Sequence, residues 1–190
     1  REQALQLGRE GHRIFARLRN SSVPTFAFIN GAAMGGGLEV ALHCHYRTLS
    51  SSVTMLALPE VGLGLVPAWG GTQLLPKLVG IINAATVIVQ NPLQQNKMLR
   101  AAQAYEMGIA DVLLDPADFL ERSLEWAASV VRGETTVSRT PVETKDWDGV
   151  IAFARALLDE KLHGAAPAPY RALDLLALAK DAPFEVGTAA

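Results

Sequence analysis

The sequence contains one cysteine, few aromatic residues and no excess of positive charge. Because Cys44 is the single cysteine, the chain can form neither an internal disulfide nor a cysteine-based zinc cluster. Seventeen Lys and Arg against nineteen Asp and Glu give a net charge of -2, and no basic block indicates binding to nucleic acid. The chain has no signal-peptide pattern and no uninterrupted apolar run of about 18 residues. We therefore expect a soluble protein without a membrane span, in a reducing compartment such as the cytoplasm.

What the chain does contain is enough apolar residues for a real core. With 190 residues, of which 49% are hydrophobic, it fits one domain or one domain with a small appendage. The first residue is Arg1, and Leu7, Gly11, Ile14 and Leu18 recur at helical spacing within residues 2–20. A chain that starts inside a helix is expected to be a segment of a longer polypeptide.

The pattern of elements changes along the chain. The first part alternates between short apolar runs typical of strands and stretches with helical periodicity, punctuated by glycines. After residue 116 every long segment has helical periodicity, so we predict an α/β core over residues 1–115 and a helical region over 116–190. We expect strands at 25–29, 46–50, 54–57 and 109–114. Two helices are expected to start near 38 and 70, and further helices are expected at 81–89, 101–107, 117–131, 142–162 and 170–180. A rigid hinge is expected at 165–169.

Three glycines, Gly35 to Gly37, stand where an expected strand leads into an expected helix. Glycines there let backbone N–H groups approach a ligand, and a helix N-terminus carries about +0.5 of a charge, so the turn suits an anion or an oxyanion. Close packing explains many such turns equally well. The spacing matches neither G-x-G-x-x-G nor the P-loop, which disfavours nucleotide binding.

Two glutamates are the candidate acid and base. Glu39 follows the glycines in the first helical turn, where it could serve chemistry or simply complement the helix dipole. Glu60 is the only charge in a long apolar stretch, residues 50–69, so burial would raise its pKa as a general acid requires. An exposed turn would also accommodate it.

The histidines beside Cys44 invite a metal or nucleophile hypothesis. His43 and His45 are two residues apart on a helix and so point about 200° away from each other, which prevents them from binding one ion together. Packing or surface roles are favoured for all three residues. Met55 and Trp69 are interpreted as core or pocket-wall residues.

Taken together, two segments resemble the signature of the crotonase (enoyl-CoA hydratase/isomerase) superfamily. They are Ile29-Asn-Gly-Ala-Ala-Met-Gly-Gly-Gly-Leu-Glu-Val-Ala-Leu-His-Cys44 and Leu58-Pro-Glu-Val-Gly-Leu-Gly-Leu-Val-Pro-Ala-Trp-Gly-Gly-Thr-Gln73. The similarity covers residues 2–114, and the remainder resembles the linker helices of multifunctional fatty-acid oxidation α-subunits. The resemblance implies a crotonase-like spiral ββα core followed by a C-terminal helical region.

The resemblance also implies roles for individual residues. Gly36 matches one of two oxyanion-hole donors to the thioester carbonyl, and Glu39 and Glu60 match the two glutamates that hold a water between them. Glu39 would help activate the water, and Glu60 would be the main acid/base at C2. The family's second oxyanion donor precedes the helix at which this chain begins, so we expect the segment alone to be poorly active.

The implied activity is enoyl-CoA hydration: water adds to the 2,3-double bond of a trans-2-enoyl-CoA and gives a 3-hydroxyacyl-CoA in fatty-acid β-oxidation. Hydration needs no metal or redox cofactor; the CoA thioester is the substrate, and NAD would serve only a 3-hydroxyacyl-CoA dehydrogenase portion that is absent here. The resemblance implies a thiolase subunit as partner, and self-association is possible. The alternatives are an enoyl-CoA isomerase, another crotonase reaction, and a non-catalytic scaffold that binds a partner.

Overall fold

The computed structural model describes residues 2–189. Its helices are α1 (Glu2–Arg19), α2 (Gly36–His43), α3 (Gly71–Ala85), α4 (Ala101–Glu106), α5 (Phe119–Val131), α6 (Trp147–Leu162), α7 (Pro167–Leu178) and α8 (Phe184–Ala189), with a short 3₁₀ helix η1 (Glu60–Leu63) and a π-helical turn η2 (Thr86–Gln90). The strands are β1 (Phe26–Ile29), β2 (Ala33–Met34), β3 (Tyr46–Ser50), β4 (Leu56–Ala57) and β5 (Val112–Leu114).

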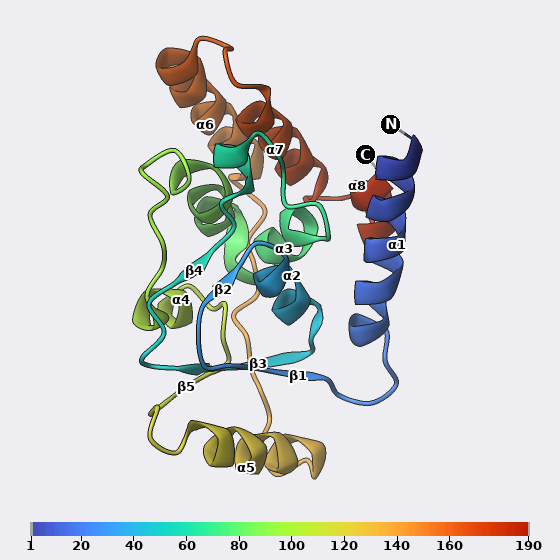
Figure 1. Ribbon diagram of the computed structural model, residues 1–190, viewed down its shortest axis with the longest axis vertical. Helices are drawn as coiled ribbons and strands as arrows, with labels where there is room; N and C mark the ends of the chain where they lie inside the picture. The colour runs from blue at the N-terminus through green and yellow to red at the C-terminus, as the bar shows by residue number, and fades with distance from the viewer. Residues whose placement is uncertain (1, 190) are drawn as a thin grey trace.

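The larger sheet is parallel, with the strand order β1-β3-β5. Phe26 pairs with Tyr46 at one end, and Thr48 of β3 pairs with Val112 of β5. Helix α5 lies below this sheet, whereas α2 and α3 lie on its other side (Figure 1). A hydrogen bond of 2.7 Å between the hydroxyls of Thr48 and Ser123 joins the sheet to α5. Helices on both faces explain why β3 is almost wholly buried.

Helices α6 and α7 pack on α3 and share its hydrophobic core. Trp147, Leu173 and Leu176 belong to the same buried cluster as the strand and α2 residues. Two side chains donate hydrogen bonds across this junction: the Trp147 indole N–H to the Leu176 carbonyl at 3.0 Å, and the Gln73 amide N–H to the Leu175 carbonyl at 2.8 Å. The Oε1 of Gln73 is buried without a partner among the described residues. The helical half is therefore docked on the α/β core by both apolar burial and specific hydrogen bonds.

One helical segment, Gly71–Gln90, is long and apolar enough to cross a membrane by length and composition alone. It is mostly buried inside the fold, and it is broken at Gly80, whose φ of 81° is not helical. The core helix of a soluble protein meets the same criteria. We assign this segment to the hydrophobic core, because most of its apolar side chains belong to the buried cluster, although Ile82 is exposed.

A buried arginine joins the end of α2 to β3 and β5. The Arg47 guanidinium donates to the carbonyls of Ile109 and Cys44, both at 2.7 Å, and its backbone N–H donates to Asp111. Arg139 reaches the same Asp111 from the segment before α6, at 2.7 Å. Burial lowers the pKa of Arg47 to about 10, and the charge of Asp111 opposes that shift. The carboxylate of Asp111 thus offsets two guanidinium charges.

Two helices differ in detail from what the sequence pattern indicates. The residues that recur at helical spacing on α1 include Leu7 and Ile14, whose side chains are 67% and 47% exposed. Instead, α1 turns Gly11 and Phe15 toward Trp69, so closely that a Cβ on Gly11 would overlap the indole. The hinge expected at 165–169 is partly the first turn of α7, because proline fits the start of a helix, where its missing N–H costs nothing.

Candidate active site

Two short parallel strands bring the glycine turn and Glu60 to the same place. Ala33 pairs with Leu56, and Met34 pairs with Ala57. The Gly35 N–H continues the ladder by donating to the Ala57 carbonyl at 3.0 Å. Because the strands are parallel, the segments that follow them leave from the same edge. The turn that starts α2 and the loop that carries Glu60 are therefore neighbours.

Glu39 lies in the first turn of α2 and is only 2% exposed. Its Oε1 accepts two backbone hydrogen bonds, each of 2.8 Å, from the N–H groups of Trp69 and Gly71. Burial raises the pKa of the Glu39 carboxyl to about 7; the two N–H groups oppose this shift, and the nearby charge of Glu60 adds to it. A carboxyl with a pKa near neutrality can exchange a proton in either direction under physiological conditions.

Glu60 is the first residue of η1 and is half-buried. Its Oε2 atom is buried and has no hydrogen-bond partner among the described residues, and its Oε1 lies 3.0 Å from where a Cβ on Gly35 would stand. Burial raises the pKa of this carboxyl as well. A carboxyl oxygen without a protein partner is free to meet a ligand or a water molecule.

Gly36 opens α2 beside these two carboxyls. Its N–H is among the first of the helix, which have no partner within the helix and lie at the positive end of the helix dipole. The six-membered ring of Trp69 lies next to it: a Cβ on Gly36 would be 3.0 Å from Cζ3 and 3.1 Å from Cε3. A side chain here would fit only if the indole or the helix start moved by a few tenths of an ångström.

The structure thus brings together all three residues that the sequence suggested. Glu39 and Glu60 flank the turn from Gly35 to Gly37, and the charge of Glu60 acts on the pKa of Glu39. Sequence reasoning missed the backbone N–H groups of Trp69 and Gly71, which carry no side-chain signal. The only available hint was the Gly70-Gly71 pair, because glycines permit such a close approach to a buried carboxylate.

The residues around Cys44 have packing contacts. His43 is fully buried and bonds the Trp69 carbonyl at 2.8 Å, whereas the His45 ring bonds Thr25. Cys44 is buried. Within residues 2–189, no three His, Cys, Asp or Glu side chains gather where they could hold a metal ion. Met55 lies just before β4 and is 41% exposed, so it is not a core residue; its interpretation as a pocket-wall residue stays a prediction.

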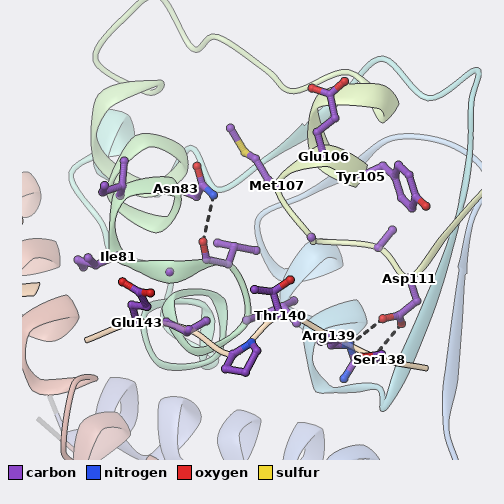
Figure 2. A pocket seen from close by; sticks show the side chains of 18 of the residues that line it. Ile81, Asn83, Tyr105, Glu106, Met107, Asp111, Ser138, Arg139, Thr140 and Glu143 are labelled. Atoms are coloured by element: carbon purple, nitrogen blue, oxygen red, sulfur yellow. Dashed lines mark hydrogen bonds and ion pairs between the residues drawn. The ribbon is translucent and has the colours of Figure 1, made fainter. Parts of the chain in front are cut away.

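A separate cavity of about 810 Å³ lies under the extended segment that leads from α5 to α6. Figure 2 shows the ion pair of Arg139 with Asp111 on one side of it, and Asn83 and Glu143 on the other. Neither Glu39 nor Glu60 lines this cavity. Arg139 pairs with Asp111, and the Asn83 amide donates to the Val79 carbonyl at 3.0 Å. The cavity is therefore separate from the paired-carboxyl site.

Comparisons with known proteins identify relatives of the sequence. The chain is 40% identical over 181 residues to a fatty acid oxidation complex subunit alpha of Shewanella loihica. The matched region covers 91% of this chain and 25% of that protein. A second such subunit, of Shewanella amazonensis, is 37% identical over the same length. The chain therefore spans about a quarter of the length of these curated relatives.

Solved structures agree in fold. DspI of Pseudomonas aeruginosa superposes with a TM-score of 0.62 at 30% identity, over 90% of this chain and 61% of that one. An enoyl-CoA hydratase of Mycobacterium avium subsp. paratuberculosis gives a TM-score of 0.62 at 22% identity, over 99% and 71% of the two chains, which supports the fold alone. The profile of the enoyl-CoA hydratase/isomerase family matches residues 2–145. This chain, with its crotonase-like fold and its C-terminal helices, belongs to the enoyl-CoA hydratase/isomerase family.

Proposed function

We propose that the site hydrates trans-2-enoyl-CoA thioesters to 3-hydroxyacyl-CoA. The observation that carries the proposal is that the buried carboxyl of Glu39 and the half-buried carboxyl of Glu60 lie beside the same glycine turn. Burial raises the pKa of both carboxyls, and the nearby charge of Glu60 adds to the rise at Glu39. An isomerase that only shifts the double bond needs one acid/base, so a second carboxyl beside the first favours the addition of water.

The proposed reaction uses each group once. The ionised Glu39 accepts a proton from water as the water oxygen bonds to C3, and the electron pair of the double bond moves toward the thioester oxygen. The N–H of Gly36 stabilises that oxygen, and the protonated Glu60 delivers its proton to C2. The proton that Glu39 accepted from water then passes to Glu60, which restores both groups to their starting states. Each oxyanion donor contributes about 10²- to 10³-fold to the rate, and each positioned acid or base about 10²- to 10⁴-fold.

The test is to supply the full-length gene product with two substrates. A trans-2-enoyl-CoA should gain one water, seen by mass spectrometry and by loss of the absorbance of the conjugated thioester. A trans-3-enoyl-CoA reports isomerisation, since it gains conjugation without any change in mass. Rapid isomerisation with no hydration would replace this proposal with the isomerase alternative, and inertness toward both would favour a scaffold.

Gly36→Ala keeps the backbone N–H but should displace it, so the rate of hydration is expected to fall by up to about 10²-fold, the effect of one oxyanion donor. The new Cβ would approach the Trp69 ring at 3.0 Å, so the helix start or the indole has to shift. Gly37→Ala is the matched control, because its Cβ would meet nothing within 4 Å and alanine favours the helix. Steady-state kinetics of the two variants check the prediction, and equal rates would contradict the role given to Gly36.

The names of the two Shewanella relatives suggest that this chain is part of a larger, multifunctional protein. We extend the proposal to a multifunctional β-oxidation subunit that also carries 3-hydroxyacyl-CoA dehydrogenase activity and associates with a thiolase subunit. The support is the name and the identity of the Shewanella relatives. Purification of the full-length product from its own host should yield a thiolase in the same fraction, whereas recovery as a lone monomer argues against the association.

A further inference from the structure

His43 lies on the same face of α2 as Glu39, four residues later. The imidazole is fully buried, and its Nε2 is 2.8 Å from the carbonyl oxygen of Trp69. Because a carbonyl oxygen only accepts hydrogen bonds, His43 is the donor and carries its proton on Nε2. The other nitrogen, Nδ1, is buried without a partner among the residues that the structure describes. The ring is therefore neutral in this arrangement.

The loop that His43 bonds is the loop that holds Glu39. The N–H groups of Trp69 and Gly71 donate to Glu39 Oε1, while the carbonyl of Trp69 accepts from His43. The residue between them, Gly70, has a φ of 114°, and a Cβ there would be 2.9 Å from His43 Nε2. Two side chains of α2 thus hold the loop from Trp69 to Gly71: Glu39 accepts from its N–H groups, and His43 donates to its Trp69 carbonyl.

We propose that His43 is a positioning residue for Glu39: it holds the Trp69 carbonyl so that the Trp69 and Gly71 N–H groups stay directed at Glu39 Oε1. Both bonds go to Oε1, which leaves Oε2 for the water that the proposed reaction uses. The inference rests on the proposed function for the role of Glu39 in hydration, and on geometry alone for the contact between His43 and the loop.

The surroundings determine how a change at His43 acts on Glu39. Aromatic edges of Phe15 and Phe184 enclose the imidazole, and Arg19 and His12 of α1 are the charged and titratable groups that face it. Arg19 is paired in turn with Glu185 of α8. Glu39 itself is faced by Glu60 of η1. Burial lowers the pKa of His43, and the charges of Arg19 and His12 lower it further. The imidazole therefore donates to the Trp69 carbonyl in its neutral form.

The test compares His43→Leu with His43→Gln. Leucine fills the volume and removes the donor, whereas the glutamine amide N–H replaces the imidazole Nε2–H. In His43→Leu the loop N–H groups are no longer held on Glu39, so the pKa of Glu39 is expected to rise by about one unit, the effect of weakening one hydrogen bond to a charged group. His43→Gln should behave as the wild type. His43→Met serves as a second donor-free variant in case leucine prevents folding.

Two readouts separate this inference from the proposed function. The first is the acidic limb of kcat for hydration, which should move up by about one pH unit in the donor-free variants with little change in KM. The second is the pH at which stability declines as Glu39 ionises, which needs no activity. An inactive wild type would refute the function and leave the second readout valid. Equal midpoints in His43→Leu and His43→Gln, with either readout, would overturn the positioning role.

Discussion

Glu60→Gln is expected to abolish both the hydration of a trans-2-enoyl-CoA and the exchange of the C2 protons of a saturated acyl-CoA with deuterated solvent. Glutamine preserves the size of the side chain and removes the base that faces C2. Because a positioned acid or base contributes about 10²- to 10⁴-fold, both rates should fall by at least about 10²-fold. Mass spectrometry measures the deuterium incorporated, and the gain of one water measures hydration.

Glu39→Gln provides the contrast. Exchange at C2 needs only a base beside C2 and hydrogen-bond donors at the thioester oxygen, whereas hydration also needs a water activated and placed at C3. Glu39→Gln should therefore lose hydration and retain measurable exchange. The glutamine oxygen can still accept the N–H groups of Trp69 and Gly71, so the loop stays in place.

The two variants together decide the division of labour. Equal exchange in Glu39→Gln and Glu60→Gln would show that the two carboxyls act as one unit without separate roles. Hydration at the wild-type rate by Glu60→Gln would contradict the role of Glu60 as the acid that delivers a proton to C2. Circular dichroism of both proteins excludes unfolding as the cause of any loss.

Much of the secondary structure could be predicted from the period of the apolar residues. The strand expected at 46–50 matches β3, and the turn from Gly35 to Gly37 leads into α2 as expected. Both are cases in which a change of hydrophobic period coincides with a glycine turn. The orientation of α1 could not be read in the same way, because the helix meets its neighbour through Gly11, where close approach to Trp69 replaces apolar side-chain burial.

In the candidate site, too, one part could be predicted from the sequence and another part could not. The sequence pointed to Glu39 because it follows the glycine turn at the start of a helix, and to Glu60 because it is the only charge in an apolar stretch. The parallel pairing of β2 with β4 explains why they meet. The contacts that hold Glu39 come from backbone N–H groups. Every residue except proline has such a group, so no residue type signals it. The bond from His43 to the Trp69 carbonyl was hidden for the same reason.

The second prediction concerns stability, since the buried Glu39 also costs free energy when it ionises. Its pKa is raised from its ordinary value of 4.5 to about 7 in the folded protein. Between these two values the folded state holds a proton that the unfolded chain has released. Stability therefore falls as the pH rises through this window. A shift of this size corresponds to about 3 kcal/mol, at 1.36 kcal/mol for each pKa unit.

Glu39→Gln should remove this pH dependence, because glutamine is neutral at every pH and keeps the same two backbone hydrogen bonds. The variant is expected to match the wild type near pH 4.5 and to exceed its free energy of unfolding by about 3 kcal/mol above pH 7. Urea unfolding at a series of pH values, followed by tryptophan fluorescence, measures both. Glu125→Gln, at an exposed position on α5, changes the net charge equally and should retain the wild-type slope. A slope that persists unchanged in Glu39→Gln would mean that another group titrates in this window, which would contradict the raised pKa of Glu39 in the folded protein.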